Sequence, residues 1–239
     1  MIKWVIVFML VCNVGYSEKV STIERYPSVL GRQYWVDKEG NMQMFRVIDG
    51  AIVAGSTDAP IELSEFLCTT EEFGDFELKV EARMTESHQI AGVQFRAQRV
   101  AGSMYVGGYQ ADMGFIRAEA IPMLSDIESV ETNAPYPLWG SLLDEHRPEP
   151  SRYQDPDAPY WLLAVANRSL VDNVLNPGDW NNVTVRAVGP SISIWLNGTQ
   201  TVDYVEEEPV PETGLICLQV HLGEPSQAMY RNISLRTIP

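Results

Sequence analysis

Residues with directed hydrogen bonds occupy every second position in three apolar segments of the chain. They are the pairs Gln94 and Arg96, Gln110 and Asp112, and Gln219 and His221. If the segments are β-strands, residues two positions apart point to the same side of a sheet. An ordinary solvated strand face favours Lys, Glu and Thr, and each pair alone fits such a face. The recurrence on three strands favours a groove that grips hydroxyl groups.

Several familiar catalytic patterns are missing from the sequence. It has no GxSxG, no HExxH, no Gly-rich phosphate loop and no Cys/His nucleophile arrangement. It also lacks the Glu-x-Asp-x-x-Glu strand of laminarinase-type enzymes. A two-carboxylate glycosidase would have to use scattered acids such as Asp112, Glu145 and Asp203.

Apolar and polar residues alternate along most of the chain, which indicates half-buried β-strands. Clear examples are residues 76–83, 93–98, 183–187, 192–196 and 233–236. Asn197-Gly198 between two such segments is a strong hairpin signal. The pattern predicts an all-β fold, an antiparallel β-sandwich or jelly roll, with residues 18–239 as a single domain.

One stretch, about residues 114–172, departs from this pattern. Its strand signal is weak and prolines cluster in it. A loop excursion of this length is uncommon in a compact domain and is usually functional. A decorative surface insertion is the equal alternative. The stretch carries Trp139, Asp144, Glu145, His146 and Arg147.

The N-terminus has the pattern of a signal peptide. Lys3 supplies the positive charge, residues 4–14 are apolar, and a small-x-small cleavage site follows. The apolar run is too short to span a bilayer, and Val11, before Cys12, stands where a lipoprotein needs a small residue. We therefore expect residues 1–17 to be cleaved and the protein to be secreted or periplasmic, without a lipid anchor or a membrane span.

The charge balance narrows the class of partner. The chain has 17 Lys and Arg against 32 Asp and Glu, a net charge of −15 at pH 7. A negative field repels phosphate backbones, so no nucleic-acid partner is expected.

Cys68 and Cys217 lie in apolar segments, where they could form a disulfide or remain as buried free thiols.

Nine short motifs together resemble one known family, the 3-keto-disaccharide hydrolase domain. They are Phe73–Leu78, Gly92–Arg96, Gly108–Asp112, Trp139–Glu145, Gly178–Asn181, Trp195–Gly198, Asp203–Tyr204, Gly214–His221 and Arg231–Ile233. Each motif is weak, but the ordered set is specific and covers the chain from about Gln33 to the C-terminus. Ile90-Ala91 replaces the Asn-Ser that the family often has, and the stretch after Asp112 is long, which leaves substrate specificity open.

The resemblance implies a concanavalin A-like lectin/glucanase sandwich and an exported enzyme acting on 3-keto-glycosides. A keto group at C3 of a sugar makes the C2 hydrogen acidic. A base can remove that hydrogen, and the C1 substituent then leaves by β-elimination. Water can add afterwards, which gives net hydrolysis. Such a site needs a base, an electrophile for the enolate and an acid for the leaving group.

The resemblance also suggests roles for individual residues. His221 suits the base, because the pKa of histidine lies near working pH. Arg96, or a divalent metal ion held by Asp112 and His221, would stabilise the enolate, and Glu145 would serve as acid. The expected substrate-binding residues are Gln94, Gln110, Gln219, Trp139 and Arg147, with Gln110 and Gln219 orienting hydroxyls and Trp139 stacking on a sugar ring.

Two other classes of function stay open at this point. A non-catalytic, lectin-like carbohydrate-binding module would have a shallow groove with exposed aromatic residues, and His221 would be buried elsewhere. A structural module of a cell-surface assembly would instead expose an apolar patch. The enzyme hypothesis predicts that Arg96, Asp112, Glu145, Gln219 and His221 converge in one deep cleft with a basic or metal-binding centre.

Overall fold

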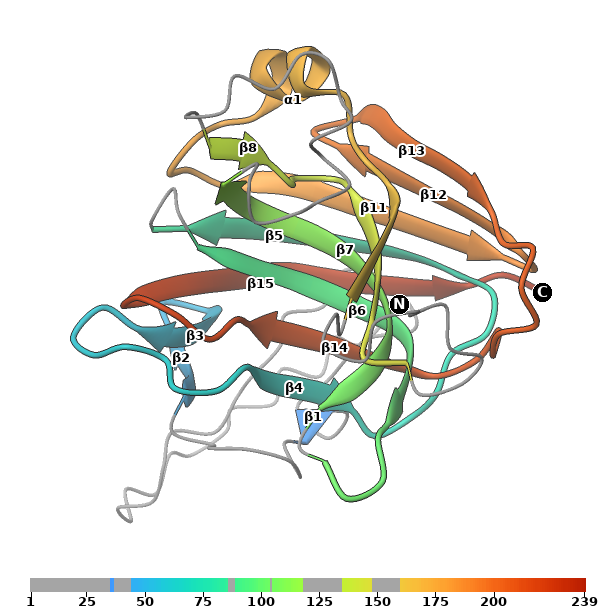
Figure 1. Ribbon diagram of the computed structural model, residues 1–239, viewed down its shortest axis with the longest axis horizontal. Helices are drawn as coiled ribbons and strands as arrows, with labels where there is room; N and C mark the ends of the chain where they lie inside the picture. The colour runs from blue at the N-terminus through green and yellow to red at the C-terminus, as the bar shows by residue number, and fades with distance from the viewer. Residues whose placement is uncertain (1–34, 37–43, 86–88, 104, 118–134, 148–159) are drawn as a thin grey trace, which may run out of the picture.

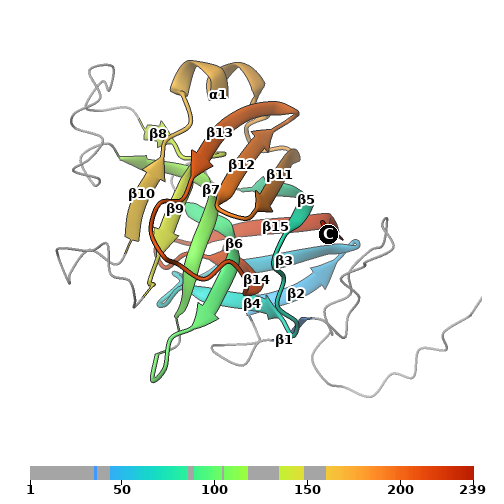
Figure 2. The same ribbon diagram turned by 90° about the vertical axis from the view of Figure 1, so that its right-hand side faces the viewer.

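The computed structural model describes residues 35–36, 44–85, 89–103, 105–117, 135–147 and 160–239. Within them the chain forms two antiparallel sheets packed face to face (Figures 1 and 2). This arrangement confirms the predicted β-sandwich. The expected signal peptide and much of the expected excursion lie outside the described residues.

Among the described residues one sheet has eight strands and the other has seven. The eight-stranded sheet has the order β1 (Trp35–Val36), β4 (Glu65–Thr69), β14 (Leu215–Val220), β6 (Ile90–Arg99), β7 (Val106–Arg117), β9 (Leu142–Glu145) and β10 (Tyr160–Ala164), with β8 (Pro135–Pro137) beside β7. The seven-stranded sheet has the order β13 (Thr199–Val205), β12 (Ser191–Leu196), β11 (Asn181–Val188), β5 (Phe76–Met84), β15 (Ser226–Thr237), β3 (Ala51–Ser56) and β2 (Phe45–Ile48). One short helix, α1 (Arg168–Val174), precedes β11 in the described part of the chain.

The core between the sheets follows from the alternation in the sequence. On β5, Phe76, Leu78 and Val80 are at most 2% exposed and face the other sheet, where Val93 and Phe95 of β6 are fully buried. Burying apolar surface in this way is the main favourable term in folding. Each inner-facing residue also fixes the direction of its neighbours, so the next residues along β6 must point to the outer face.

The structure confirms one local prediction from the sequence and decides one alternative that the sequence left open. Asn197 and Gly198 both have positive φ, 49° and 84°, and join β12 to β13, as the hairpin signal predicted. Cys68 and Cys217 form a disulfide between directly paired residues of β4 and β14. The alternative of two free thiols is therefore excluded.

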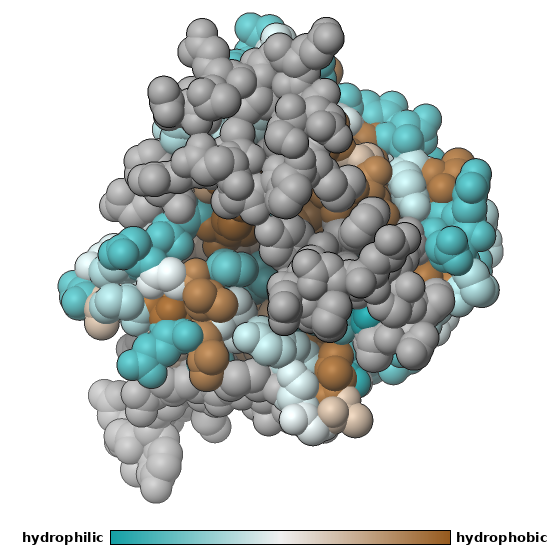
Figure 3. All heavy atoms as spheres, in the orientation of Figure 1, coloured by the Kyte–Doolittle hydropathy of each residue, from teal (hydrophilic) through white to brown (hydrophobic). Residues whose placement is uncertain are grey.

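On the face that Figure 3 shows, the described residues are a mixture of polar and apolar ones. The exposed large apolar side chains of the described residues are Ile48, Leu63, Val205 and Leu222. Leu222 lies beside the segment that carries Leu63, because its backbone N–H donates to Ser64 Oγ at 3.2 Å. Within the described part of the chain, none of the helices has the length and apolar character needed to cross a membrane.

Candidate active site

Five polar residues cluster on the outer face of the eight-stranded sheet, which points away from the core. Gln94 comes from β6, Gln110 and Asp112 from β7, Glu145 from β9 and Gln219 from β14. All five are at most 4% exposed. We call this group the glutamine cage. It confirms that the glutamines and Asp112, predicted from strand alternation, share one face.

The carboxylate of Glu145 is the centre of the cage. It accepts hydrogen bonds at Oε2 from the Nε2 atoms of Gln94 (3.1 Å) and Gln219 (3.0 Å), and at Oε1 from Gln110 Nε2 (3.3 Å). Gln110 Nε2 also donates to Gln219 Oε1 at 2.8 Å and lies 3.4 Å from Asp112 Oδ1. Amide donors from three strands therefore hold one carboxylate in place.

The backbone around the cage is built to fit these side chains. Gly92 of β6 leaves the space that the Gln110 side chain fills, because a Cβ there would lie 2.4 Å from Gln110 Cδ. From the opposite sheet, the hydroxyl of buried Tyr230 lies 2.5 Å from the carbonyl oxygen of Gln219 and 3.2 Å from that of Gly92. The core thus supports the strands that carry the cage.

Burial raises the pKa of both carboxyl groups. It raises the pKa of Glu145 to about 7, although the amides of Gln219 and Gln94 favour the charged form and oppose the rise. The pKa of Asp112 lies well above its usual range, first because of burial and second because of the nearby charge of Glu145. Near neutral pH, Glu145 can therefore give or take a proton, and the raised pKa of Asp112 favours its protonated form.

Three buried side-chain oxygens in the cage have no hydrogen-bond partner. They are Gln94 Oε1, Gln110 Oε1 and Asp112 Oδ2. Leaving a buried polar atom unpaired costs roughly 1–3 kcal/mol, so native proteins rarely keep such atoms without a reason. The two amide oxygens need donors and a protonated Asp112 needs an acceptor, so the three atoms together indicate a ligand that can do both, and hydroxyl groups fit this requirement.

The pKa of Glu145 gives a testable consequence. Because the amides of Gln219 and Gln94 stabilise the charged carboxylate, Gln219→Leu should raise the pKa of Glu145 above about 7. If protonated Glu145 is the active form, the alkaline limb of the pH–rate profile should move to higher pH. The matched control is Gln227→Leu on β15, which should leave the limb in place. If the alkaline limb of the pH–rate profile stayed in place in Gln219→Leu, its assignment to the deprotonation of Glu145 would be wrong.

His221 follows directly after β14 and is half-buried. Its Nδ1 lies 2.8 Å from the carbonyl oxygen of Leu222. A carbonyl only accepts, so Nδ1 carries the hydrogen and Nε2 is left as the acceptor. Burial lowers the pKa of His221, opposed by the Leu222 bond. The ring is therefore neutral near pH 7 and able to accept a proton. No hydrogen bond among the described residues joins it to the cage.

His146 is a candidate that the sequence analysis did not single out. Its φ is +50°, and its ring stacks on Tyr105 with centroids 4.2 Å apart. Burial, followed by the charge of His221, lowers the pKa of His146 to about 4. The only sequence signal was its place directly after Glu145. The backbone conformation that turns its ring toward Tyr105 is not readable from residue type.

Arg96 does not share the face of Gln94, so its predicted placement is wrong. The register between β6 and β7 shifts between Phe95 and Gln98, and Arg96 has a φ of +47°. This bulge resets the alternation. The Arg96 guanidinium instead donates to the carbonyl oxygen of Gly189 (2.7 Å) and pairs with Asp75 (3.1 Å), away from the cage.

Trp139 and Arg147 are also placed away from the cage. Trp139 is 3% exposed and packs in the apolar core, so its ring is not available to stack on a sugar. Arg147 is 3% exposed, pairs with Asp144 at 2.9 Å and lies 4.8 Å from the ring centroid of Tyr109, a core residue. Both predicted placements are wrong, because these side chains lie on the core side.

The expected metal ligands, Asp112 and His221, are not joined by a third. The described part of the chain contains no group of three or more His, Cys, Asp or Glu residues placed to hold a metal ion. Asp112 Oδ1 accepts from the backbone of Met113 at 2.9 Å, and only Oδ2 is unpaired. A metal role for this pair stays a prediction.

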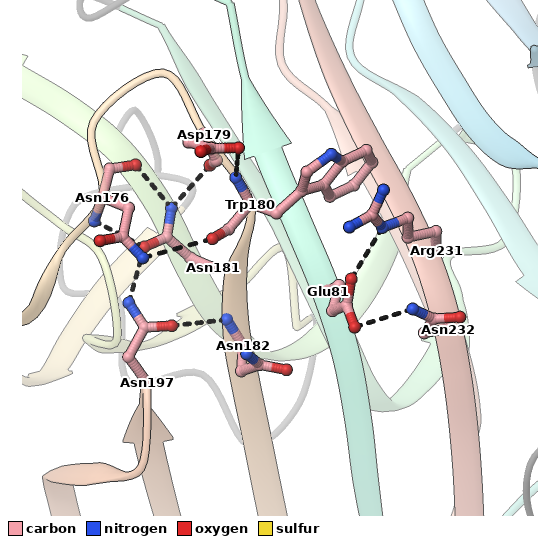
Figure 4. Close-up of polar contacts among 9 residues, drawn as sticks. All are labelled: Glu81, Asn176, Asp179, Trp180, Asn181, Asn182, Asn197, Arg231 and Asn232. Carbon is pink, nitrogen blue, oxygen red and sulfur yellow. Dashed lines mark hydrogen bonds and ion pairs between the residues drawn. The ribbon is translucent and has the colours of Figure 1, made fainter. Parts of the chain in front are cut away.

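A second polar cluster lies around the start of β11 in the seven-stranded sheet (Figure 4). The Arg231 guanidinium stacks 3.9 Å from the ring centroid of Trp180 and pairs with Glu81 at 2.7 Å. Buried Asn181 is hydrogen-bonded to Asn176, Asp179 and Asn197. These contacts fasten the loop before β11 to the hairpin after β12, so we assign this cluster a structural role.

Solved structures similar to this chain share its sandwich fold. A carbohydrate-binding module, CBM66, from Bacillus subtilis has a TM-score of 0.54 and 12% identity, over 86% of this chain and 96% of that one. A putative glycosyl hydrolase from Parabacteroides distasonis has a TM-score of 0.56 and 18% identity, over 86% and 88%. A legume lectin-like domain from Entamoeba histolytica has a TM-score of 0.53 and 13% identity, over 95% and 100%.

At these identities the likeness shows the fold alone. No curated protein matches the chain. A family model, in contrast, matches residues 30–236, which is most of the chain and includes every member of the glutamine cage. Its description, 3-keto-alpha-glucoside-1,2-lyase-like domain, agrees with the resemblance seen in the motifs and relates the chain to carbohydrates. The chain therefore belongs to the 3-keto-alpha-glucoside-1,2-lyase-like domain family.

Proposed function

We propose that this protein is an exported enzyme that cleaves 3-keto-glycosides by β-elimination, followed by hydration of the product. The observation that carries the proposal is the buried Glu145, whose pKa is about 7 and whose carboxylate is held by three glutamines. A group with a pKa near the working pH is best suited to move protons in catalysis. The family to which the chain belongs supports the substrate class.

The reaction needs one proton removed and one delivered. When the C2–H bond breaks, its electron pair forms an enolate with the C3 carbonyl. The enolate then collapses to a C1–C2 double bond as the C1–O bond breaks, and the leaving oxygen takes a proton. Addition of water across the double bond gives the free 3-keto-sugar. No oxidant or reductant is consumed in these steps.

The residues can be assigned to these steps. Neutral His221 accepts the C2 proton at Nε2, and protonated Glu145 delivers a proton to the leaving oxygen. Asp112, kept protonated by its raised pKa, donates from its unpaired Oδ2 to the enolate oxygen. A buried neutral carboxyl is an effective donor to such an oxygen. Asp112 thus takes the part that the sequence analysis gave to Arg96.

Export from the cytoplasm is part of the proposal. The Cys68–Cys217 disulfide supports this location, because disulfides persist in oxidising compartments and cytosolic thiols are kept reduced. The signal-peptide pattern of residues 1–17 agrees with this location. We further propose that residues 18–239 form one domain, because every strand from β2 to β15 except β8 contributes to a shared core.

Incubation of the purified protein with a 3-keto-glucoside tests the proposal. We expect release of the aglycone, no release from the unoxidised glucoside, and loss of turnover in His221→Ala. A parallel sample with chelator decides whether Asp112 and His221 act through a divalent ion, since turnover then disappears. Tight binding of unoxidised sugar without release from either substrate would instead favour the lectin-like alternative, which the three unpaired oxygens also suit.

A further inference from the structure

An apolar patch borders the glutamine cage on the outer face of the eight-stranded sheet. Its buried members are Phe66, Cys68, Ala97, Val106, Leu215 and Cys217, with Tyr105 packed against them. The strand register makes patch and cage neighbours, because Cys217 is paired with Gln94, and Phe66 with Gln219. The outer face therefore has a polar half and an apolar half that meet along β14.

Three aromatic rings, which we call the aromatic ledge, lie at the patch. Tyr105 meets Phe66 edge-on, with centroids 6.5 Å apart and an interplanar angle of 81°. His146 stacks on Tyr105 at 4.2 Å and 19°. Phe66 is buried, whereas Tyr105 and His146 are each only partly buried. The accessible part of the patch is thus aromatic.

The backbone at His146 is in an unfavourable conformation. A φ of +50° costs energy in a residue with a side chain, and such strain gathers at functional sites. Ordinary strand alternation would point His146 away from the face of Glu145, yet its ring lies on Tyr105. The ring is also neutral at physiological pH, because burial holds its pKa at about 4. A neutral ring can stack on an uncharged partner without the cost of desolvating a charge.

We propose that the aromatic ledge is a binding subsite for the leaving group of the glycoside, and that it takes aromatic leaving groups. This inference rests on the proposed function. Glu145, which delivers the proton to the leaving oxygen, directly precedes His146, so the C1 substituent departs next to the ledge. The hydroxyl-rich ring then occupies the polar half of the face, and an aryl group covers the apolar half. Offset stacking of aromatic rings contributes specific affinity beyond area burial.

A pair of substrates with matched leaving-group acidity tests the subsite. Benzyl and methyl 3-keto-glucosides release alcohols of similar acidity, so their kcat/KM ratio reports binding of the ring. We expect wild type to prefer the benzyl substrate by roughly tenfold, the size of one aromatic contact. Tyr105→Ala should bring the ratio close to one, and Tyr105→Phe should keep it. Trp180→Ala, on the other sheet, is the remote aromatic control and should also keep it.

The outcomes separate the subsite from the proposed reaction. An equal benzyl-to-methyl ratio in wild type and Tyr105→Ala would overturn the subsite while leaving the reaction intact. If wild type released neither alcohol, titration calorimetry with unoxidised benzyl and methyl glucosides would decide. A Tyr105-dependent preference for the benzyl glucoside would then support the subsite although the reaction had failed. Binding without such a preference would overturn both.

Discussion

Glu145→Gln should lower the rate of aglycone release by roughly 10²- to 10⁴-fold, the usual contribution of a general acid or base. Glutamine has nearly the shape of glutamate but no proton to deliver at neutral pH. Steady-state kinetics on a 3-keto-glucoside measures the effect. Wild-type rates in this variant would remove Glu145 from the mechanism.

The same substitution should make the protein more stable at alkaline pH. The pKa of Glu145 rises from 4.5 to about 7 on folding, so the folded protein holds this proton where the unfolded chain has lost it. The free energy of unfolding therefore falls as pH rises from about 4.5 to 7 and stays reduced above that. The shift corresponds to about 3 kcal/mol. Denaturant titrations should show Glu145→Gln gaining up to about this amount at pH 8 and little at pH 5.

Asp144→Asn is the matched control, one residue earlier on the same strand. Asp144 is buried on the core side and pairs with Arg147 at 2.9 Å. Removing its charge leaves the Arg147 guanidinium buried without its partner, which should cost roughly 3–5 kcal/mol. Neighbouring carboxyl groups on β9 should therefore respond in opposite directions. A loss of stability in Glu145→Gln at pH 8 would contradict the account of the buried charge.

Removal of the Cys68–Cys217 disulfide should have the second large effect. The bond joins residues 149 positions apart in sequence, so it restricts much of the unfolded chain. We expect the double variant Cys68→Ala/Cys217→Ala to lose roughly 3–5 kcal/mol of unfolding free energy. Urea titration with and without reductant measures this loss.

Reductant should destabilise the wild type by a similar amount and leave the double variant unchanged. Alanine is preferred over serine because both positions are at most 1% exposed, and a hydroxyl there would be buried without a partner. An equal midpoint for oxidised and reduced wild type would show that the disulfide does not contribute to stability.

The sandwich could be predicted from sequence because one face of most strands is buried. Alternation on β5 and the Asn197-Gly198 turn both led to the right local structure. The same alternation of side-chain directions correctly placed Gln94, Gln110 and Gln219 on one face. Burial enforces this alternation strongly, since a one-residue slip of a strand's register would move every apolar side chain of that strand out of the core.

The prediction from alternation failed where the backbone departs from regular strand geometry. Arg96 lies at a bulge and has a positive φ, so its side chain leaves the face that alternation assigns. Trp139 was judged by residue type, although aromatic rings fill cores as readily as they line sugar sites. Arg147 was likewise assigned without knowledge of its ion pair with Asp144.

The most direct test of the central claim follows the hydrogen at C2. A 3-keto-glucoside labelled with deuterium at C2 would be incubated with the protein in ordinary water, with an enzyme-free sample to subtract spontaneous exchange. Our account predicts that wild type loses the label in step with aglycone release, and that Glu145→Gln slows aglycone release. Release of the aglycone with the C2 label fully retained would show cleavage without proton abstraction and would contradict the account.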